Sequence, residues 1–147
     1  MKLMRFAFLT LSLTLCASAA DIAGTWKAVF VGPIETRPKM VSTIVFDLNT
    51  DGTVLTGMAH AGSWPGDAAI SDGRIDGDRI SFTVVGTSPW KAKGPFGEAS
   101  GYPKLKFSGT IVGDKMKLTL VWDSVMIYGN AHGAAPEYEM QGKRRSD

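Results

Sequence analysis

Two segments of this chain are nearly copies of one another. Residues 73–85 read GRIDGDRISFTVV, and residues 109–121 read GTIVGDKMKLTLV. Each contains the end of one strand, a Gly-Asp turn, and a second strand in which apolar residues alternate with polar ones. Repetition of a supersecondary unit shows how a fold is assembled. Here it predicts a fold built from antiparallel hairpins that tight turns connect.

The same alternation continues beyond the two copies and predicts eight strands with no helix. It is clear at Ile80–Val84, where serine and threonine separate three large apolar side chains. One buried face and one wet face are typical of an antiparallel sheet. The expected strands are Ile22–Val31, Met40–Leu48, Thr53–His60, Ala69–Ile75, Arg79–Val85, Leu105–Val112, Lys115–Trp122 and Glu137–Lys143.

An open sheet of these strands would leave two edges unpaired, whereas closure of the sheet removes both edges. The expected fold is therefore all-β: an eight-stranded antiparallel up-and-down barrel with long loops at one end. Its interior would be apolar and bulky, which leaves little room for a deep cavity. The side chains expected inside are Phe30, Ile44, Phe46, Met58, Phe82, Phe107, Leu118 and Leu120.

Short and long connections alternate along the chain. The short ones are Asn49–Gly52, Asp76–Asp78 and Gly113–Asp114, and each contains a glycine or asparagine suited to a tight turn. The long ones are residues 32–39, 61–67, 86–104 and 123–136. Alternate connections of a meander lie at the same end, so the long loops should gather at one end, which we call the mouth. The glycine-rich runs 94–103 and 129–135 are expected to act as lid segments over it.

The mouth is rich in aromatic residues, which loops usually are not. Barrel mouths are a favoured place for small-molecule sites, and the faces of tryptophan and tyrosine stack on sugars and other rings. This favours a ligand site at the mouth; the alternative is that the rings fold back and plug the barrel. The residues expected to contact a ligand are His60, Trp64, Trp90, Tyr102, Trp122, Tyr128 and His132.

Residues 1–20 have the three-part pattern of a secretory signal peptide, which leaves 21–147 as a single β-barrel domain. Lys2 and Arg5 form a basic start, the apolar run that follows is too short to cross a membrane, and small residues place cleavage near Ala19 or Ala20. The expected location is therefore periplasmic or extracellular. A lipoprotein would be acylated at Cys16, but a leucine stands before it where a small residue is expected.

The sequence has one cysteine, and it lies in the expected signal peptide. A mature chain without disulfides fits export from a bacterium better than a eukaryotic secretory route. The full chain has 16 Lys and Arg against 14 Asp and Glu, so loss of Lys2 and Arg5 leaves 14 of each and no net formal charge. A neutral chain does not indicate nucleic-acid binding. We expect a monomer without cofactor or transmembrane segment.

The two ends of the expected barrel carry a family resemblance. Gly24-Thr-Trp-Lys opens the first strand, and the run Met140-Gln-Gly-Lys-Arg144 closes the last. Together with Asp51-Gly52, the run Leu55–Gly57 and the two Gly-Asp hairpins, they resemble small exported bacterial lipocalin-like, or calycin-like, domains. The resemblance implies a cup-shaped barrel that binds a small molecule, with a basic residue stacked over the tryptophan.

Barrel closure leads to the same pair without the family. The first and last strands must meet, so Arg144 is expected over the ring of Trp26 as a structural contact. Lys143 is the alternative partner if the register shifts by one residue.

The chain contains no pattern that assigns a catalytic residue or a metal ligand. Two small sets, His60 with Ser63 and Asp67, and His132 with Asp123 and Ser124, lack a strained nucleophile elbow. The two histidines also lack the local spacing of metal ligands. Two alternatives to simple ligand binding stay open. One is a small barrel enzyme with His60 or His132 as general base; the other is an interaction module whose Trp64 or Trp90 docks a partner protein.

Overall fold

The computed structural model describes residues 22–31, 43–62, 66–87, 89–94, 97–122 and 137–146. Their strands form a closed barrel and a separate two-stranded hairpin. The barrel strands are β1 (Gly24–Phe30), β2 (Thr43–Asp51), β3 (Val54–His60), β4 (Ala68–Asp76), β5 (Arg79–Val85), β8 (Lys104–Val112), β9 (Lys115–Trp122) and β10 (Glu137–Arg144). The hairpin strands are β6 (Trp90–Gly94) and β7 (Gly97–Gly101).

The barrel strands lie in the order β1-β10-β9-β8-β5-β4-β3-β2, and β2 pairs again with β1. Every pair is antiparallel, so each strand lies beside its neighbours in the chain and β10 closes the sheet onto β1. This confirms the predicted all-β, eight-stranded, antiparallel up-and-down barrel. The architecture is compatible with a lipocalin-like fold.

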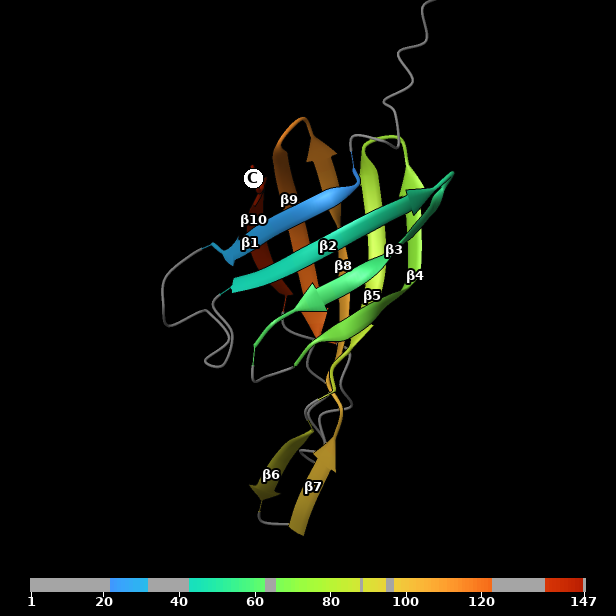
Figure 1. The fold of residues 1–147 in the computed structure, drawn as a ribbon. Coiled ribbons are helices and arrows are strands. Elements are labelled where there is room, and N and C mark those ends of the chain that lie inside the picture. Colours follow the sequence, from blue (N-terminus) through green and yellow to red (C-terminus); the bar gives the residue numbers. More distant parts are fainter. Residues whose placement is uncertain are drawn as a thin grey trace, which may run out of the picture.

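The two copies of the repeat occupy equivalent places in the barrel. Residues 73–85 cover the end of β4, a turn and β5, and residues 109–121 cover the end of β8, a turn and β9. The turn glycines Gly77 and Gly113 both have φ of 61°. In Figure 1 these two turns lie at the upper end of the barrel, and the β6–β7 hairpin extends from the opposite end.

Aromatic side chains fill the middle of the barrel. Phe46 has no solvent exposure, and its ring centroid lies 5.3 Å from both the Phe82 and the Phe107 centroids. The Phe82 and Phe107 rings stack at 5.0 Å. Aromatic pairs at such distances add to the free energy that burial alone supplies. The interior at this level is thus a packed core rather than an open cup.

Of the side chains predicted to lie inside the barrel, Met58 is the one that lies outside. It is 38% exposed and is the cross-strand partner of Asp47 on the outer face. The buried side chains of β3 are Leu55 and Ala59 instead, and Ala59 lies opposite the bulky Phe46. A small residue at that position leaves room for the phenylalanine ring, so size outweighs the greater hydrophobicity of methionine.

Two other expectations need correction. The predicted loop 86–104 contains the β6–β7 hairpin, in which Ala92 lies opposite Ala99, because its alternating short stretches pair with each other rather than with the barrel. The turn predicted at Asn49–Gly52 is shorter, since β2 continues to Asp51. The predicted lid run 129–135 lies outside the described residues.

The first and last strands meet as the closure argument expects. Trp26 is fully buried, its Nε1–H donates to the Ile22 carbonyl at 2.9 Å, and it lies opposite Arg144 in the β1–β10 register. The Arg144 guanidinium carbon lies 4.6 Å from the ring centroid of Trp26. The Arg144 Nη1 also donates to the Ala23 carbonyl at 2.6 Å. One side chain therefore stacks on the indole and ties the start of the first strand to the end of the last.

We expect Arg144→Ala to lower the free energy of unfolding by about 1–3 kcal/mol, because it removes a cation–π contact and a charge-assisted hydrogen bond. Urea denaturation followed by tryptophan fluorescence measures this. Lys143→Ala is the matched control, since Lys143 is exposed on the outer face and lies opposite another lysine. An equal loss in both variants would contradict the stacking role of Arg144.

None of the described residues forms a helix with the length and apolar character that a membrane crossing requires.

Candidate functional site

The inward-facing side chains at the mouth ends of β1, β9 and β10 are aromatic. Phe30 is buried, and its ring meets that of Tyr138 edge-on at 6.0 Å between centroids. Trp122 and Tyr138 are only half-buried and pack on the core. Tyr138 lies directly opposite Leu120, so Trp122 is its diagonal neighbour, a separation that large rings span. These three rings form what we call the aromatic floor of the mouth.

Tyr102 stands at the rim of the same end. It is 59% exposed and lies between β7 and β8, next to Pro103, which is fully buried. The Gly86 N–H donates to the Pro103 carbonyl at 2.8 Å, which fixes the chain where the hairpin joins the barrel. An exposed ring on an anchored backbone is suited to contact a ligand because little conformational freedom is lost on binding.

The other predicted mouth residues fall into two groups. Trp90 is the first residue of β6 and lies opposite Gly101, the last residue of β7. Its backbone is therefore at the base of the hairpin. Trp64, Tyr128 and His132 lie outside the described residues.

Tyr138 was missed by the sequence reasoning. It lies two residues before the buried Met140 on the inward face of β10, and this two-residue alternation was the signal that would have found it.

His60 lies at the mouth end of β3, but its side chain is on the outer wall. Its Nε2 is 3.0 Å from Asp47 Oδ2, and its Nδ1 is 3.0 Å from Asp67 Oδ2. The Thr25 hydroxyl donates to the other oxygen of Asp47 at 2.6 Å. The imidazole thus joins β2 to the segment that leads into β4.

The two contacts of His60 identify its protonation state. A neutral imidazole has one N–H donor, whereas the imidazolium donates from both nitrogens. Here both nitrogens face carboxylate oxygens, so the charged form fits. The hydrogen bond to Asp67 is the largest influence on the pKa of His60 and raises it above its ordinary value of 6.5; burial opposes this, and Asp47 adds to it. The hydrogen bond from Thr25 is the largest influence on the pKa of Asp47 and lowers it below 3.8.

This network predicts a pH window for stability. The raised pKa of His60 contributes stability that is complete below pH about 6.5 and is lost as pH rises through the folded-state pKa. The lowered pKa of Asp47 contributes stability that is present above pH about 3.8 and is lost as pH falls through the folded-state pKa. The contribution is therefore largest between roughly pH 4 and 6.5. All three side chains are more than a third exposed, so solvent screens the effect.

We expect the urea midpoint of the wild type to fall between about pH 6 and pH 8, and this fall to disappear in His60→Gln. Titration of the His60 ring by NMR should give a midpoint above 6.5. Asp51→Asn is a control for a change of charge on β2 outside the network. A midpoint at or below the ordinary histidine value would contradict the doubly bonded imidazolium.

This geometry does not suit His60 to general-base catalysis, because a base needs a nitrogen with a free lone pair. Across the described ranges, histidine, cysteine, aspartate and glutamate side chains form no group of three or more arranged to hold a metal ion. Among the residues that the structure describes, the site at the mouth is the aromatic floor with the Tyr102 rim, which provides aromatic rings and no acid–base pair.

No protein-family model, curated protein or solved structure matches this chain.

Proposed function

We propose that the protein is an exported binding barrel that holds a ring-bearing small molecule, such as a glycoside or the end of a glycan, at its mouth without chemical change. The observation that carries the proposal is the aromatic floor: Trp122 and Tyr138 face inward at the mouth end, pack on the core and are only partly buried. Ring faces that are half-buried in this way offer apolar contact area and stay accessible to a ligand.

The packed interior supports a shallow site. Phe46, Phe82 and Phe107 occupy the middle of the barrel with centroid separations of 5.0–5.3 Å. An eight-stranded barrel has an interior that side chains are just able to fill. A long acyl chain that needs a deep apolar cavity is therefore a poor match. A flat or ring-shaped ligand that rests on Trp122 and Tyr138 is a better one.

Tyr102 at the rim also supports a flat or ring-shaped ligand. Tyr102 is exposed beside a buried proline at the same end of the barrel, so its ring is available to a ligand that rests on the aromatic floor. Aromatic side chains that are exposed on an anchored backbone are the kind that dominate small binding sites.

Native mass spectrometry of the mature protein, released gently from its own exported fraction, tests the proposal. We expect an added mass that leaves on mild activation and identifies the ligand directly. Tyr102→Ala should lose that mass, because it removes the rim. Val112→Ala is the matched control: Val112 is also an exposed side chain, at 64%, but lies at the opposite end of the barrel. Equal retention in both variants would place the ligand somewhere other than the mouth.

The affinity for the identified ligand gives a quantitative check. Tyr102→Ala should weaken binding by about tenfold, the effect of losing one stacked ring worth about 1.4 kcal/mol. Val112→Ala should leave the dissociation constant within about twofold. Isothermal titration calorimetry measures both, and the urea midpoints of the two variants show whether the barrel is intact. An unchanged affinity in Tyr102→Ala with an intact barrel would remove the rim from the site.

A further inference from the structure

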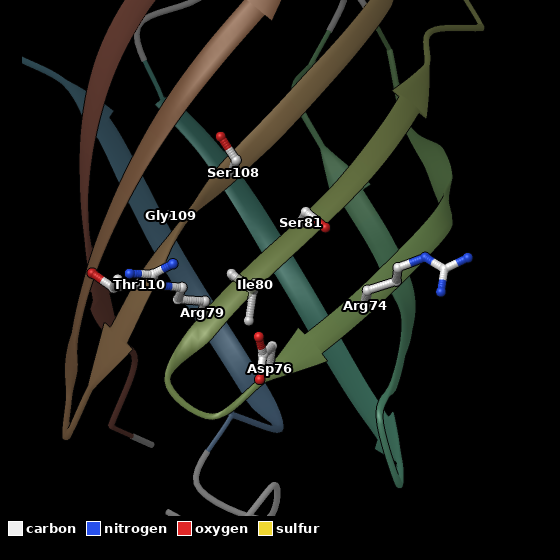
Figure 2. Close-up of a pocket in the computed structure, with 8 residues that line it drawn as sticks. All are labelled: Arg74, Asp76, Arg79, Ile80, Ser81, Ser108, Gly109 and Thr110. Atoms are coloured by element: carbon white, nitrogen blue, oxygen red, sulfur yellow. The ribbon is translucent and has the colours of Figure 1, made fainter.

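The outer wall of the barrel carries a trough that runs across the strands. One depression, of about 390 Å³, lies over β4, β5 and β8, and Figure 2 shows the residues that line it. A second, of about 340 Å³, lies over β8, β9 and β10. The two share Gly109 and Thr110 as lining residues, so they form one continuous surface across five strands. Neighbouring strands are about 4.8 Å apart, which makes the trough about 19 Å long.

Gly109 lines both depressions and lies close to the backbone of β9. A Cβ added there would lie 1.9 Å from the Lys117 carbonyl oxygen and 2.9 Å from the Leu118 Cα. Only glycine permits β8 to approach the backbone of β9 so closely. The backbone where the two depressions meet is therefore held by a position that needs glycine.

The lining combines hydroxyl groups and cations with the apolar side chains of Val31, Ile80, Leu118 and Met140. Ser81, Ser108 and Thr119 lie directly opposite one another on β5, β8 and β9. In the next row, Arg79 lies opposite Thr110, and Thr110 lies opposite Lys117. Figure 2 shows the Arg79 side chain extending toward Thr110, and that of Arg74 on the far flank of the depression. Two acids, Asp76 and Glu139, stand at opposite ends.

Charge is unevenly distributed over the barrel. Strands β1, β9 and β10 carry five Lys or Arg side chains and two acids, whereas β2, β3 and β4 carry one Arg, four acids and His60. Lys143 lies directly opposite both Lys27 and Lys115, and all three are exposed. Like charges in directly opposed positions destabilise a sheet. A row of three lysines beside the trough is therefore explained better by attraction of an anion than by stability.

The chemistry of the lining selects the kind of anion. Besides its apolar side chains, the trough offers hydroxyls, an amide at Gln141 and cations, and none of the described residues that line it is aromatic. Single-stranded nucleic acids bind largely through stacking of their bases on aromatic rings, so they have no platform here. A polymer that carries hydroxyl and carboxylate groups along an extended chain matches both rows: its carboxylates meet Arg79 and Lys117, and its hydroxyls meet the serine and threonine row.

We propose that this outer-wall trough is a second binding site, separate from the mouth, that takes an acidic linear polysaccharide of the polyuronate type. The chain lies across β4, β5, β8, β9 and β10. Arg79 and Lys117 pair with its carboxylates, and the row Lys27, Lys143 and Lys115 draws it to this face. The site does not depend on the mouth, so either site can fail its test while the other stands.

Titration of the full mature chain with a short oligogalacturonate at low salt tests the proposal, with calorimetry as the readout. Arg79→Gln with Lys117→Gln should weaken binding by about tenfold or more, because two charge-assisted contacts are lost. Lys91→Gln with Lys93→Gln is the matched control: both lysines are exposed on β6, away from the trough. The affinity of this control variant for the oligogalacturonate should stay within about twofold of the wild-type affinity. Raising the salt to about 0.3 M should weaken binding of the wild type several-fold.

Comparison ligands separate the ligand classes. Neutral dextran oligomers and oligothymidylate of matched length should bind at least about tenfold more weakly than the oligogalacturonate. Amide chemical shifts in the wild type should move on β5, β8 and β9 and not around Tyr102. The proposal is overturned if the oligogalacturonate fails to bind at low salt, or if the trough variant binds as the wild type does. Oligothymidylate binding as tightly, or shifts confined to the mouth, would also overturn it. Far-UV circular dichroism and urea midpoints confirm that both double variants are folded.

Discussion

Phe46→Ala is expected to lower the free energy of unfolding by about 3–5 kcal/mol, one of the largest losses that any single change in this barrel should cause. Phe46 has no exposed surface, and its ring contacts the Phe82 and Phe107 rings edge-on at 5.3 Å each. The truncation removes the transfer free energy of the ring and leaves a cavity beside the stacked Phe82 and Phe107 rings. Urea denaturation measures the loss.

Val54→Ala is the matched control, because Val54 is an apolar strand residue that is 50% exposed. It should change the free energy of unfolding by less than about 0.5 kcal/mol. The loss of unfolding free energy in Phe46→Leu should lie between the losses in Val54→Ala and Phe46→Ala, since leucine fills part of the ring volume. A loss below about 1 kcal/mol in Phe46→Ala would mean that the middle of the barrel is hollow, and a deep ligand cavity would then replace the shallow site.

Gly57→Ala is expected to cost about 3 kcal/mol or more, through backbone strain and overpacking together. Gly57 has a φ of 142°, where side chains are rarely found, and a Cβ there would lie 1.9 Å from the Asp47 carbonyl oxygen. The obstacle is the backbone of β2, which cannot rotate away as a side chain can. Measurement of the urea midpoint, or failure to recover folded protein, reports the effect.

Gly113→Ala separates strain from crowding. Gly113 also has a positive φ, 61°, but no heavy atom lies within 4 Å of its added Cβ. Only the left-handed conformation is then penalised, which costs about 1–2 kcal/mol. Equal losses of unfolding free energy in Gly57→Ala and Gly113→Ala would show that the close approach of β3 to β2 adds no cost to the substitution.

The repeat explains why the architecture was predictable from the sequence. Both copies keep the turn glycine, and both keep a leading glycine that approaches a neighbouring strand closely, β3 for Gly73 and β9 for Gly109. A Cβ on Gly73 would lie 1.8 Å from the Leu55 carbonyl oxygen, and one on Gly109 would lie 1.9 Å from that of Lys117. Alternation of side chains and the positions of the turns therefore identify the strands and their order. Where neighbouring residues of a strand are similar in size or polarity, neither the alternation nor the turns show which face of the strand points inward. Met58 was misplaced for that reason.

The candidate site was less predictable. Position along the chain placed His60 at the mouth end, but only the register shows that it faces outward to Asp47. Its pairing with Asp67 depends on the segment before β4, whose conformation no periodic pattern encodes. The trough could not be predicted for another reason. Net charge is a sum over the whole chain, so it does not show that Lys27, Lys143 and Lys115 lie opposite one another on neighbouring strands.

The claim that the barrel is filled and binds its ligand at the mouth is tested most directly by NMR. Isotope-labelled mature protein is titrated with a panel of aromatic glycosides while the amide and methyl signals are followed. We predict binding at the mouth over a filled core, with shifts at Trp122, Tyr138 and Tyr102 and with the methyl signals of Ile44 and Leu118 unchanged. Shifts centred on those interior methyl groups, or no shift at the aromatic floor with any member of the panel, would contradict it.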